Sequence, residues 1–273
     1  MGNMKFKIAA FADEAAPTLE GQISAMKENG VQALEIRGID GENVADISGQ
    51  KAREIAARLN AEGLEVWSIG SPFGKIGIGD DFNSHLEKFR RCLETAYILG
   101  AKHFRLFSFY GAEHIEDVLE RLSAFVFAAK GSGIVLCHEN EKGIYGDTAD
   151  KCLELHLSLP ELRAVFDPAN FVQCGQDTKE AWELLSPYVE YMHIKDAMPD
   201  GSVVPAGKGA GQLDFLLSRY KGEVLTVEPH LSVFPGFEKL EKEEKSKHAT
   251  YCYGNSRQAF AAAVSALRDI IGG

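Results

Sequence analysis

The sequence contains few cysteines, and no two of them stand in the C-x-x-C spacing of a metal or redox site. There are five, at positions 92, 137, 152, 174 and 252. An odd number of scattered cysteines is a poor disulfide framework and is typical of a reducing compartment. We therefore expect free thiols and a cytoplasmic protein.

Long apolar runs are also absent. No run approaches the roughly 18 residues that a membrane-spanning helix needs. Residues 1–7 contain no apolar segment of a signal peptide, and Phe6 stands where a myristoylation motif requires Ser or Thr. The sequence therefore predicts no membrane partner.

Basic residues are fewer than acidic ones. The chain has 29 Lys and Arg against 40 Asp and Glu, which gives a formal net charge of −11. Because an acidic surface repels phosphate backbones, this charge disfavours nucleic acid as a general partner. A small local basic site stays compatible with it.

The remaining composition is that of a folded protein. The 273 residues are 45% hydrophobic and 25% charged, which is ordinary for a globular chain. The length suits one or two domains, and it also suits one (β/α)8 barrel of about 250 residues.

A unit of one helix and one strand repeats along the chain. Four helical patterns end in a glycine that an apolar run follows at once, at Gly30, Gly63, Gly100 and Gly133, with intervals of 33, 37 and 33 residues. Glycine suits the left-handed residue after a helix because it has no Cβ. A period of this size is typical of βαβ units.

The expected strands are apolar throughout, which fits parallel strands buried on both faces. We count eight, beginning near residues 5, 32, 64, 102, 133, 162, 188 and 223. Eight strands alternating with helices predict an α/β fold, a closed (β/α)8 TIM barrel in a single domain over residues 1–273. A doubly wound open sheet is the alternative. No G-x-G-x-x-G follows the first strand, which weakens a dinucleotide-binding version.

The chain departs from the repeat in an irregular segment at about residues 231–255, before a last helix expected at 256–271. This segment includes a charged run at 238–247. The run is typical of a solvated helix. A segment this long can also form a lid or a subunit contact that supports a homodimer.

Polar side chains follow four of the expected strands. Glu139, Asp167, His193 and Glu228 end strands five to eight and are separated by 28, 26 and 35 residues. The carboxyl ends of barrel strands meet at one mouth, where the chemistry of such barrels takes place. Three carboxylates there repel one another, and a divalent cation keeps all three ionised. We therefore predict that these four residues hold one metal ion.

Each of these residues alone has a simpler interpretation, a helix cap for an acidic residue or a hydrogen-bonded core residue for the histidine. Their common register on consecutive strands favours the metal. A donor set of three oxygens and one nitrogen suits Mn²⁺, Mg²⁺ or Co²⁺, and Zn²⁺ remains compatible. We expect Cys137 to face the opposite side of its strand from His138, away from the metal.

The chain resembles the xylose isomerase-like TIM barrel superfamily, in particular its sugar phosphate isomerase/epimerase branch. The resemblance rests on HENE (138–141), FDPANF (166–171), HIKD (193–196), EPH (228–230) and the GKG loop (207–209). It covers essentially the whole chain. It implies one divalent metal on Glu139, Asp167, His193 and Glu228, with both glutamates moving a proton. Members often carry His three residues after the strand-six aspartate, where this chain has Asn170.

These observations predict an enzyme, a metal-dependent isomerase or epimerase acting on a small-molecule sugar or sugar phosphate. The metal stabilises an enediolate, while Glu139 and Glu228 flank the sugar as acid and base. A lyase that dehydrates a keto-inositol or related keto-sugar shares this intermediate and stays open. A non-catalytic sugar-binding barrel is disfavoured, because all four expected ligands are intact. The superfamily's nuclease branch is disfavoured, because strands three and four end without the histidines that hold its extra zinc ions.

Further polar residues at the strand ends are expected to contact the substrate. They are His138, Asn170, Lys195, Lys208, His230 and Arg37. A lysine ammonium can hold a hydroxyl, a carboxylate or a phosphate, although a solvated loop position is equally open for Lys208. Glu14, after the first strand, can line the mouth beside Arg37.

Overall fold

The protein is described by a computed structural model that covers residues 6–233 and 251–272. Within these residues, eight parallel strands close into one barrel, in the order β1-β2-β5-β6-β7-β8-β9-β12 and back to β1. The barrel strands are β1 (Lys7–Ala10), β2 (Ala33–Ile36), β5 (Glu65–Gly70), β6 (His103–Leu106), β7 (Val135–Glu139), β8 (Arg163–Phe166), β9 (Val189–Ile194) and β12 (Val224–Val227). The predicted TIM barrel is confirmed.

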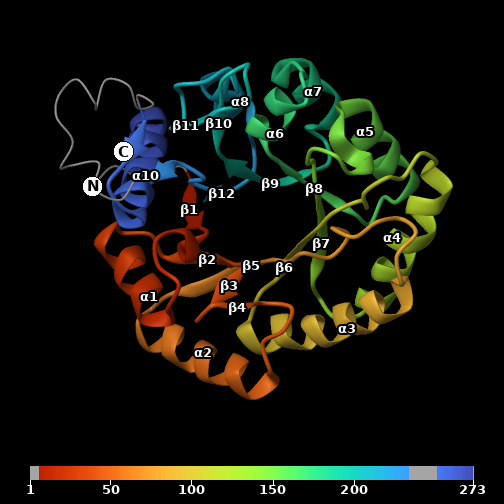
Figure 1. The fold of residues 1–273 in the computed structure, drawn as a ribbon, viewed down its shortest axis with the longest axis horizontal. Coiled ribbons are helices and arrows are strands. Elements are labelled where there is room, and N and C mark those ends of the chain that lie inside the picture. Colours follow the sequence, from red (N-terminus) through yellow and green to blue (C-terminus); the bar gives the residue numbers. More distant parts are fainter. Residues whose placement is uncertain (1–5, 234–250, 273) are drawn as a thin grey trace.

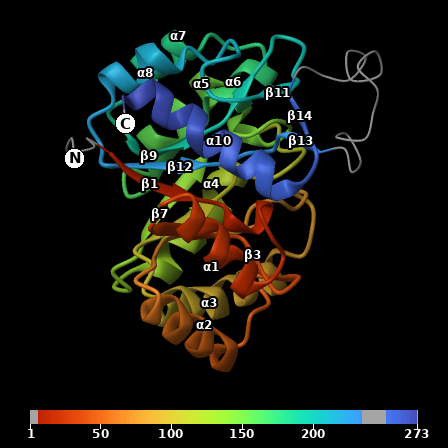
Figure 2. The same ribbon diagram turned by 90° about the vertical axis from the view of Figure 1, so that its left-hand side faces the viewer.

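A helix follows each barrel strand and packs outside it, so that the helices ring the strands in Figure 1. These helices are α1 (Leu19–Glu28), α2 (Gly49–Ala61), α3 (Phe82–Leu99), α4 (Ile115–Ala129), α5 (Ala149–Ser158), α7 (Thr178–Leu185), α8 (Leu213–Arg219) and α10 (Ser256–Ile271). A short extra helix, α6 (Pro168–Gln173), lies between β8 and α7. Figure 2 shows α10 in front of β1 and β12, where it completes the ring.

In the part of the chain that the structure describes, three two-stranded sheets lie outside the barrel. They are β3 (Gly38–Ile39) with β4 (Glu42–Asn43), β10 (Asp196–Ala197) with β11 (Val203–Val204), and β13 (Ser232–Val233) with β14 (Cys252–Tyr253). The predicted irregular segment 231–255 therefore begins and ends in the last of these pairs. The charged run 238–247 lies outside the described residues.

The four repeated glycines all have left-handed backbone. Their φ angles are +59° at Gly30, +70° at Gly63, +79° at Gly100 and +76° at Gly133. A side chain with a Cβ adopts such angles only with strain, so glycine is the residue that lets each helix turn directly into the next strand. The repeated glycine in the sequence thus reflects the left-handed backbone that is required where each helix ends.

Side chains alternate between the barrel lumen and the helices along each strand. On β7, Cys137 packs with the lumen residues while Leu136 packs in the outer core, and Glu139 again faces the lumen. Cys137 is therefore opposite His138, as expected. The expectation that it faces away from the metal ligands is wrong, because residues two apart on a strand share one side and Cys137 lies below Glu139.

The cysteines are free, as predicted. None of the helices within residues 6–233 and 251–272 combines the length and the apolar character required to cross a membrane.

His156 on α5 makes the stability of the fold sensitive to acid. Its side chain is buried, and its Nδ1–H donates to the carbonyl oxygen of Leu162 at 3.0 Å. Burial lowers the pKa of His156 from 6.5 to about 4. Because the unfolded chain takes up this proton first, the free energy of unfolding is expected to fall between pH 6.5 and pH 4, by about 2 kcal/mol at pH 5.

Denaturant unfolding at pH 7 and pH 5 measures this loss. In the matched variant His156→Asn, the amide keeps a donor for the Leu162 carbonyl but does not titrate. Its free energy of unfolding should drop by about 2 kcal/mol less than that of the wild-type protein over the same interval. Equal losses in the two proteins would show that His156 does not carry the effect.

Candidate functional site

The four predicted metal ligands meet at the carboxyl ends of the barrel strands. Each offers one donor atom, and these atoms all lie within 4.8 Å of one another. Glu139 ends β7, Asp167 follows β8, His193 lies in β9 and Glu228 follows β12. All four are at most 3% exposed. Three carboxylates and one imidazole thus form one buried cluster.

His193 presents one ring nitrogen to this cluster and the other to β2. Its Nδ1 lies 2.9 Å from Oε1 of Glu139 and 3.9 Å from Oε2 of Glu228, while its Nε2 lies 3.1 Å from Oε2 of Glu35. Burial alone would lower the pKa of His193, but the charges of Glu139 and Glu35 raise it well above the usual value. The ring therefore faces negative charge on both edges.

Glu139 is held from two sides. Arg105 of β6 donates to its Oε2, and Asn170 of α6 approaches its Oε1 with Nδ2 at 3.4 Å. Burial alone would raise the pKa of Glu139, but the charges of His193 and Arg105 outweigh it and hold the pKa below its usual value. Glu139 is therefore ionised at neutral pH.

Lys195 joins the other two carboxylates. Its Nζ lies 3.0 Å from Oδ2 of Asp167 and 2.9 Å from Oε2 of Glu228. Burial opposes its charge, yet the facing carboxylates raise the pKa of Lys195 above its usual value. The ammonium thus stays charged inside the barrel mouth.

The donor set fits a divalent cation. Despite Lys195, burial and the charges of Glu228 and Glu139 raise the pKa of Asp167 to about 7. The charge of Asp167 is therefore the least stabilised of the three, because the pKa values of Glu139 and Glu228 are lowered. Oδ2 of Asp167 also accepts no well-aligned hydrogen bond within residues 6–233 and 251–272. A hard cation takes carboxylate oxygens as ligands and supplies the missing charge.

The backbone around Asp167 is fixed by Asn140. The Asn140 side chain accepts from the Asp167 N–H and donates to its carbonyl, both at 2.9 Å. Asp167 in turn caps α6, because its Oδ1 accepts from the N–H of Asn170 at 3.0 Å, and Pro168 occupies the first helical turn. The FDPAN sequence thus turns β8 directly into a helix and leaves Oδ2 facing the cluster.

Arg37 and His230 lie at the mouth beside Glu228. Arg37 donates to Asp13 at 2.8 Å and lies 3.5 Å from Oε1 of Glu228. The N–H of His230 donates to Glu14 at 2.6 Å, and its Nε2 lies 3.6 Å from Oε1 of Glu228. The side chains of Arg37 and His230 are 28% and 42% exposed, so they stand between the buried cluster and solvent.

Lys208 is exposed on a loop that Asp196 organises. The Asp196 carboxylate accepts the backbone N–H groups of Gly207, Gly209 and Gly211 at 2.9–3.0 Å. A Cβ at Gly209 would lie 2.4 Å from both the Asp196 carboxylate and a β10 carbonyl oxygen, so only glycine allows this approach. Lys208 forms no ion pair with any of the described residues.

The structure does not bring His138 to the cluster. Its side chain faces the helices, with Nε2 3.0 Å from Oγ of Ser108 and the ring against His156. Conversely, three residues at the cluster were not anticipated from the sequence: Glu35, Arg105 and Asn140. Glu35 follows the lumen residue Ala33 at a step of two in β2, and this spacing is the signal that places its side chain toward the lumen.

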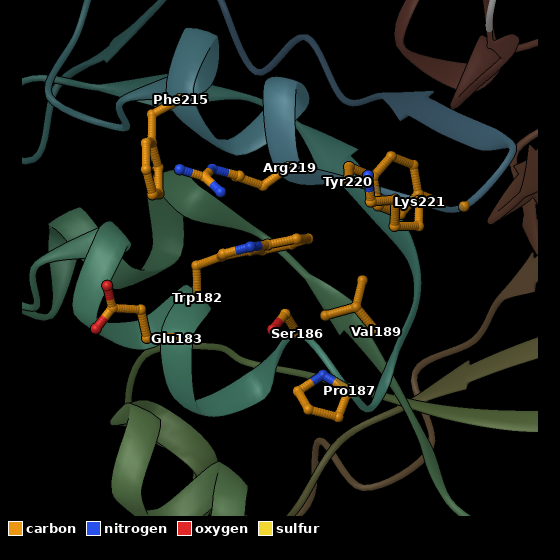
Figure 3. A pocket seen from close by; sticks show the side chains of 10 residues that line it. Trp182, Glu183, Ser186, Pro187, Val189, Phe215, Arg219, Tyr220 and Lys221 are labelled. Carbon is orange, nitrogen blue, oxygen red and sulfur yellow. The ribbon is translucent and has the colours of Figure 1, made fainter.

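A separate groove of about 630 Å³ lies between α7 and α8. Figure 3 shows Trp182 beneath Phe215 and Arg219 at this groove. Its lining residues lie before β9 and β12 or, for Val189, at the first position of β9, so the groove is at the amino ends of the strands, remote from the cluster.

Comparisons with known proteins support the barrel fold. One similar solved structure is an IOLI protein with a bound zinc atom, which is 18% identical with a TM-score of 0.74 over 98% of both chains. The probable 3-DHS dehydratase AsbF from Bacillus anthracis is 16% identical, with a TM-score of 0.72 over 97% of this chain and 98% of that chain. The 3-keto-D-glucoside 4-epimerase YcjR from E. coli is 17% identical, with a TM-score of 0.69 over 97% of this chain and 100% of that chain. At these identities the likeness shows the fold. No curated protein matches the sequence significantly. The family model described as xylose isomerase-like TIM barrel matches residues 23–230, and the chain therefore belongs to this family.

Proposed function

We propose that the protein is a divalent-metal-dependent isomerase or epimerase that acts on a sugar or sugar phosphate. The observation that carries the proposal is the buried convergence of Glu139, Asp167, His193 and Glu228 within 4.8 Å at the end of the barrel where such enzymes act. Membership of the xylose isomerase-like family supports it. The shared fold with an epimerase and with a zinc-containing protein supports it further.

The reaction begins with removal of the proton next to a sugar carbonyl, which leaves an enediolate. A divalent cation held by the four residues would stabilise the negative charge that develops there. Glu228, like Glu139, is ionised at neutral pH: burial alone would raise its pKa, but Lys195 and the other basic groups that face it hold the pKa well below the usual value. Both carboxylates are thus in the form that accepts a proton.

One glutamate removes the proton and the other returns it. Glu139 and Glu228 extend from β7 and β12, which β8 and β9 separate in the barrel, so they approach the substrate from different directions. Return of the proton to the opposite face of the same carbon gives epimerisation. Return to the neighbouring carbon gives aldose–ketose isomerisation.

Residues around the cluster bind the sugar oxygens. Oδ1 of Asn170 is buried and accepts no hydrogen bond from the described residues, so it can accept one from a hydroxyl. Lys195 donates from the opposite side of the cluster, and Arg37 and His230 contact the part of the substrate nearest to solvent. The loop of Lys208 adds an ammonium for a more distant hydroxyl or phosphate.

Dehydration of a keto-inositol or related keto-sugar is the second candidate. It starts with the same proton removal but then expels a β-hydroxyl, which needs a proton donor. The proton that a glutamate took up in the first step is available for that hydroxyl, which then leaves as water, and Lys195, 2.9 Å from Glu228, can hold the departing oxygen by a hydrogen bond. The fold similarity to a probable dehydratase is consistent with this route.

Incubation with substrate panels in D₂O tests the proposal. The Mn²⁺-loaded protein is mixed with aldoses, ketoses, their phosphates and inososes, and products are followed by NMR. We expect deuterium at the carbon next to the carbonyl, together with a new epimer or isomer. An unsaturated product would favour the dehydratase. A metal-loaded protein that exchanges no hydrogen in any of these compounds would contradict both.

A further inference from the structure

We infer that Glu35 is a positioning residue that fixes the ring orientation and tautomer of His193, so that Nδ1 is the nitrogen offered to a divalent cation. This inference rests on the metal site of the proposed function. It concerns a residue in the interior of β2, on the far side of the lumen from the carboxylates of the cluster.

Glu35 reaches His193 across the barrel. The two residues lie on β2 and β9, which β1 and β12 separate in the barrel, and both side chains have no exposed surface. Oε2 of Glu35 lies 3.1 Å from Nε2 of His193, and Oε1 accepts the hydroxyl of Tyr191 at 2.9 Å. That hydroxyl lies 3.0 Å from Oγ of Ser68. A continuous buried chain of polar groups thus ends at the imidazole.

The chemistry of the carboxylate decides the tautomer. An ionised carboxylate only accepts hydrogen bonds, so the nitrogen that faces Glu35 must carry the hydrogen. Nδ1 also faces a carboxylate, Oε1 of Glu139 at 2.9 Å, so a hydrogen on that nitrogen is held there as well. A divalent cation that took Glu139 as a ligand would replace the Nδ1 hydrogen, while the hydrogen on Nε2 would stay with Glu35. Metal-binding histidines commonly donate their second N–H to a carboxylate, which sets the tautomer and raises the basicity of the ligand.

The ring is also held in place by packing. The ring of Phe11 meets the imidazole edge-on, with 5.2 Å between centroids, and the ring of Tyr191 does so at 5.6 Å. These contacts restrict the tilt of the ring. They do not distinguish Nδ1 from Nε2, so the carboxylates at the two edges of the ring do, and Glu35 is the one that retains a hydrogen on Nε2.

The experiment compares Glu35→Ala and Glu35→Gln with Ser68→Ala as the matched control. The affinity for Mn²⁺ is measured by electron paramagnetic resonance, which requires no turnover. Loss of the carboxylate in Glu35→Ala is expected to weaken Mn²⁺ binding about 10- to 100-fold. Glu35→Gln should retain most of the affinity, because its amide oxygen accepts from His193 while its amide nitrogen donates to Tyr191. Ser68→Ala leaves the pair intact and should bind as the wild-type protein does.

The tautomer is read directly by NMR of protein labelled with ¹⁵N-histidine and loaded with diamagnetic Zn²⁺. The signal of His193, assigned by its absence in His193→Gln, is expected to show hydrogen on Nε2 and zinc on Nδ1. Wild-type protein that binds no Mn²⁺ or Zn²⁺ would overturn the metal site of the proposed function, and this inference with it. Metal bound equally by wild type and Glu35→Ala, or zinc on Nε2, would overturn the role of Glu35 alone.

Discussion

Exchange of the substrate hydrogen with solvent falls by about 10²- to 10⁴-fold when Glu228 is replaced by Gln, which is the usual contribution of a positioned acid–base group. The amide fills the same space and keeps an oxygen for a cation but cannot take up or return the proton. Exchange is measured by NMR in D₂O with the variant saturated with Mn²⁺.

The matched control for this variant is Glu223→Gln. Glu223 is exposed just before β12, so it undergoes the same chemical change at the other end of the same strand. Its exchange rate should equal that of the wild-type protein. Metal content is measured in both variants, because a loss of bound Mn²⁺ would also slow exchange. Full metal occupancy with an unchanged rate in Glu228→Gln would remove Glu228 from the reaction.

We expect Asp167→Asn to weaken Mn²⁺ binding by at least about 100-fold. Loss of a residue that only orients a ligand weakens metal binding by about 10- to 100-fold, and Asp167 is proposed to be a ligand itself. The variant removes a charge from the cluster and leaves the fold in place, because asparagine is also a good helix cap and can accept from the N–H of Asn170. Isothermal titration calorimetry measures the affinity, and a chelator-treated wild-type protein should be inactive until Mn²⁺ is restored.

Asp177→Asn provides the comparison for this second prediction. Asp177 caps α7 through the N–H groups of Lys179 and Glu180 in the same manner as Asp167 caps α6, but it lies on the surface. Its Mn²⁺ affinity should match that of the wild-type protein. Equal affinities in Asp167→Asn and the wild type would show that Asp167 is only a helix cap.

The barrel could be predicted from the sequence because its signals are local and repeated. Each glycine at a helix end, such as Gly63 or Gly100, meets a backbone requirement that neighbouring residues make visible. The four clustered residues were found for the same reason. Equivalent positions on consecutive parallel strands lie side by side, so Glu139 and Asp167 were expected to meet before any contact was known.

Glu35 and Arg105 could not be identified as site residues from the sequence, because their partners are distant along the chain. Glu35 contacts His193 across the lumen, 158 residues away along the chain, and Arg105 contacts Glu139 from a neighbouring strand. Both lie inside apolar runs rather than at strand ends, and a single charged residue within a run does not reveal its partner. Such pairings depend on closure of the barrel.

The different place of His138 from the one expected is explained by the side of β7 that its side chain faces. His138 precedes Glu139 directly and was grouped with it as a substrate contact, yet successive residues of a strand face opposite sides. The alternation that places Glu139 in the lumen places His138 among the helices, beside Ser108. Cys137 and Glu139 are two residues apart and share the lumen side of β7, so this spacing alone would have assigned Glu139 to the cluster and His138 to the outer side.

We propose that side chains at the carboxyl ends of β7, β8, β9 and β12 together hold one divalent cation. The anomalous difference map of a crystal soaked with Mn²⁺ tests this most directly. We expect one strong peak among the carboxylate oxygens of Glu139, Asp167 and Glu228 and the Nδ1 atom of His193. A map with no peak there, in a crystal that holds manganese elsewhere, would contradict it.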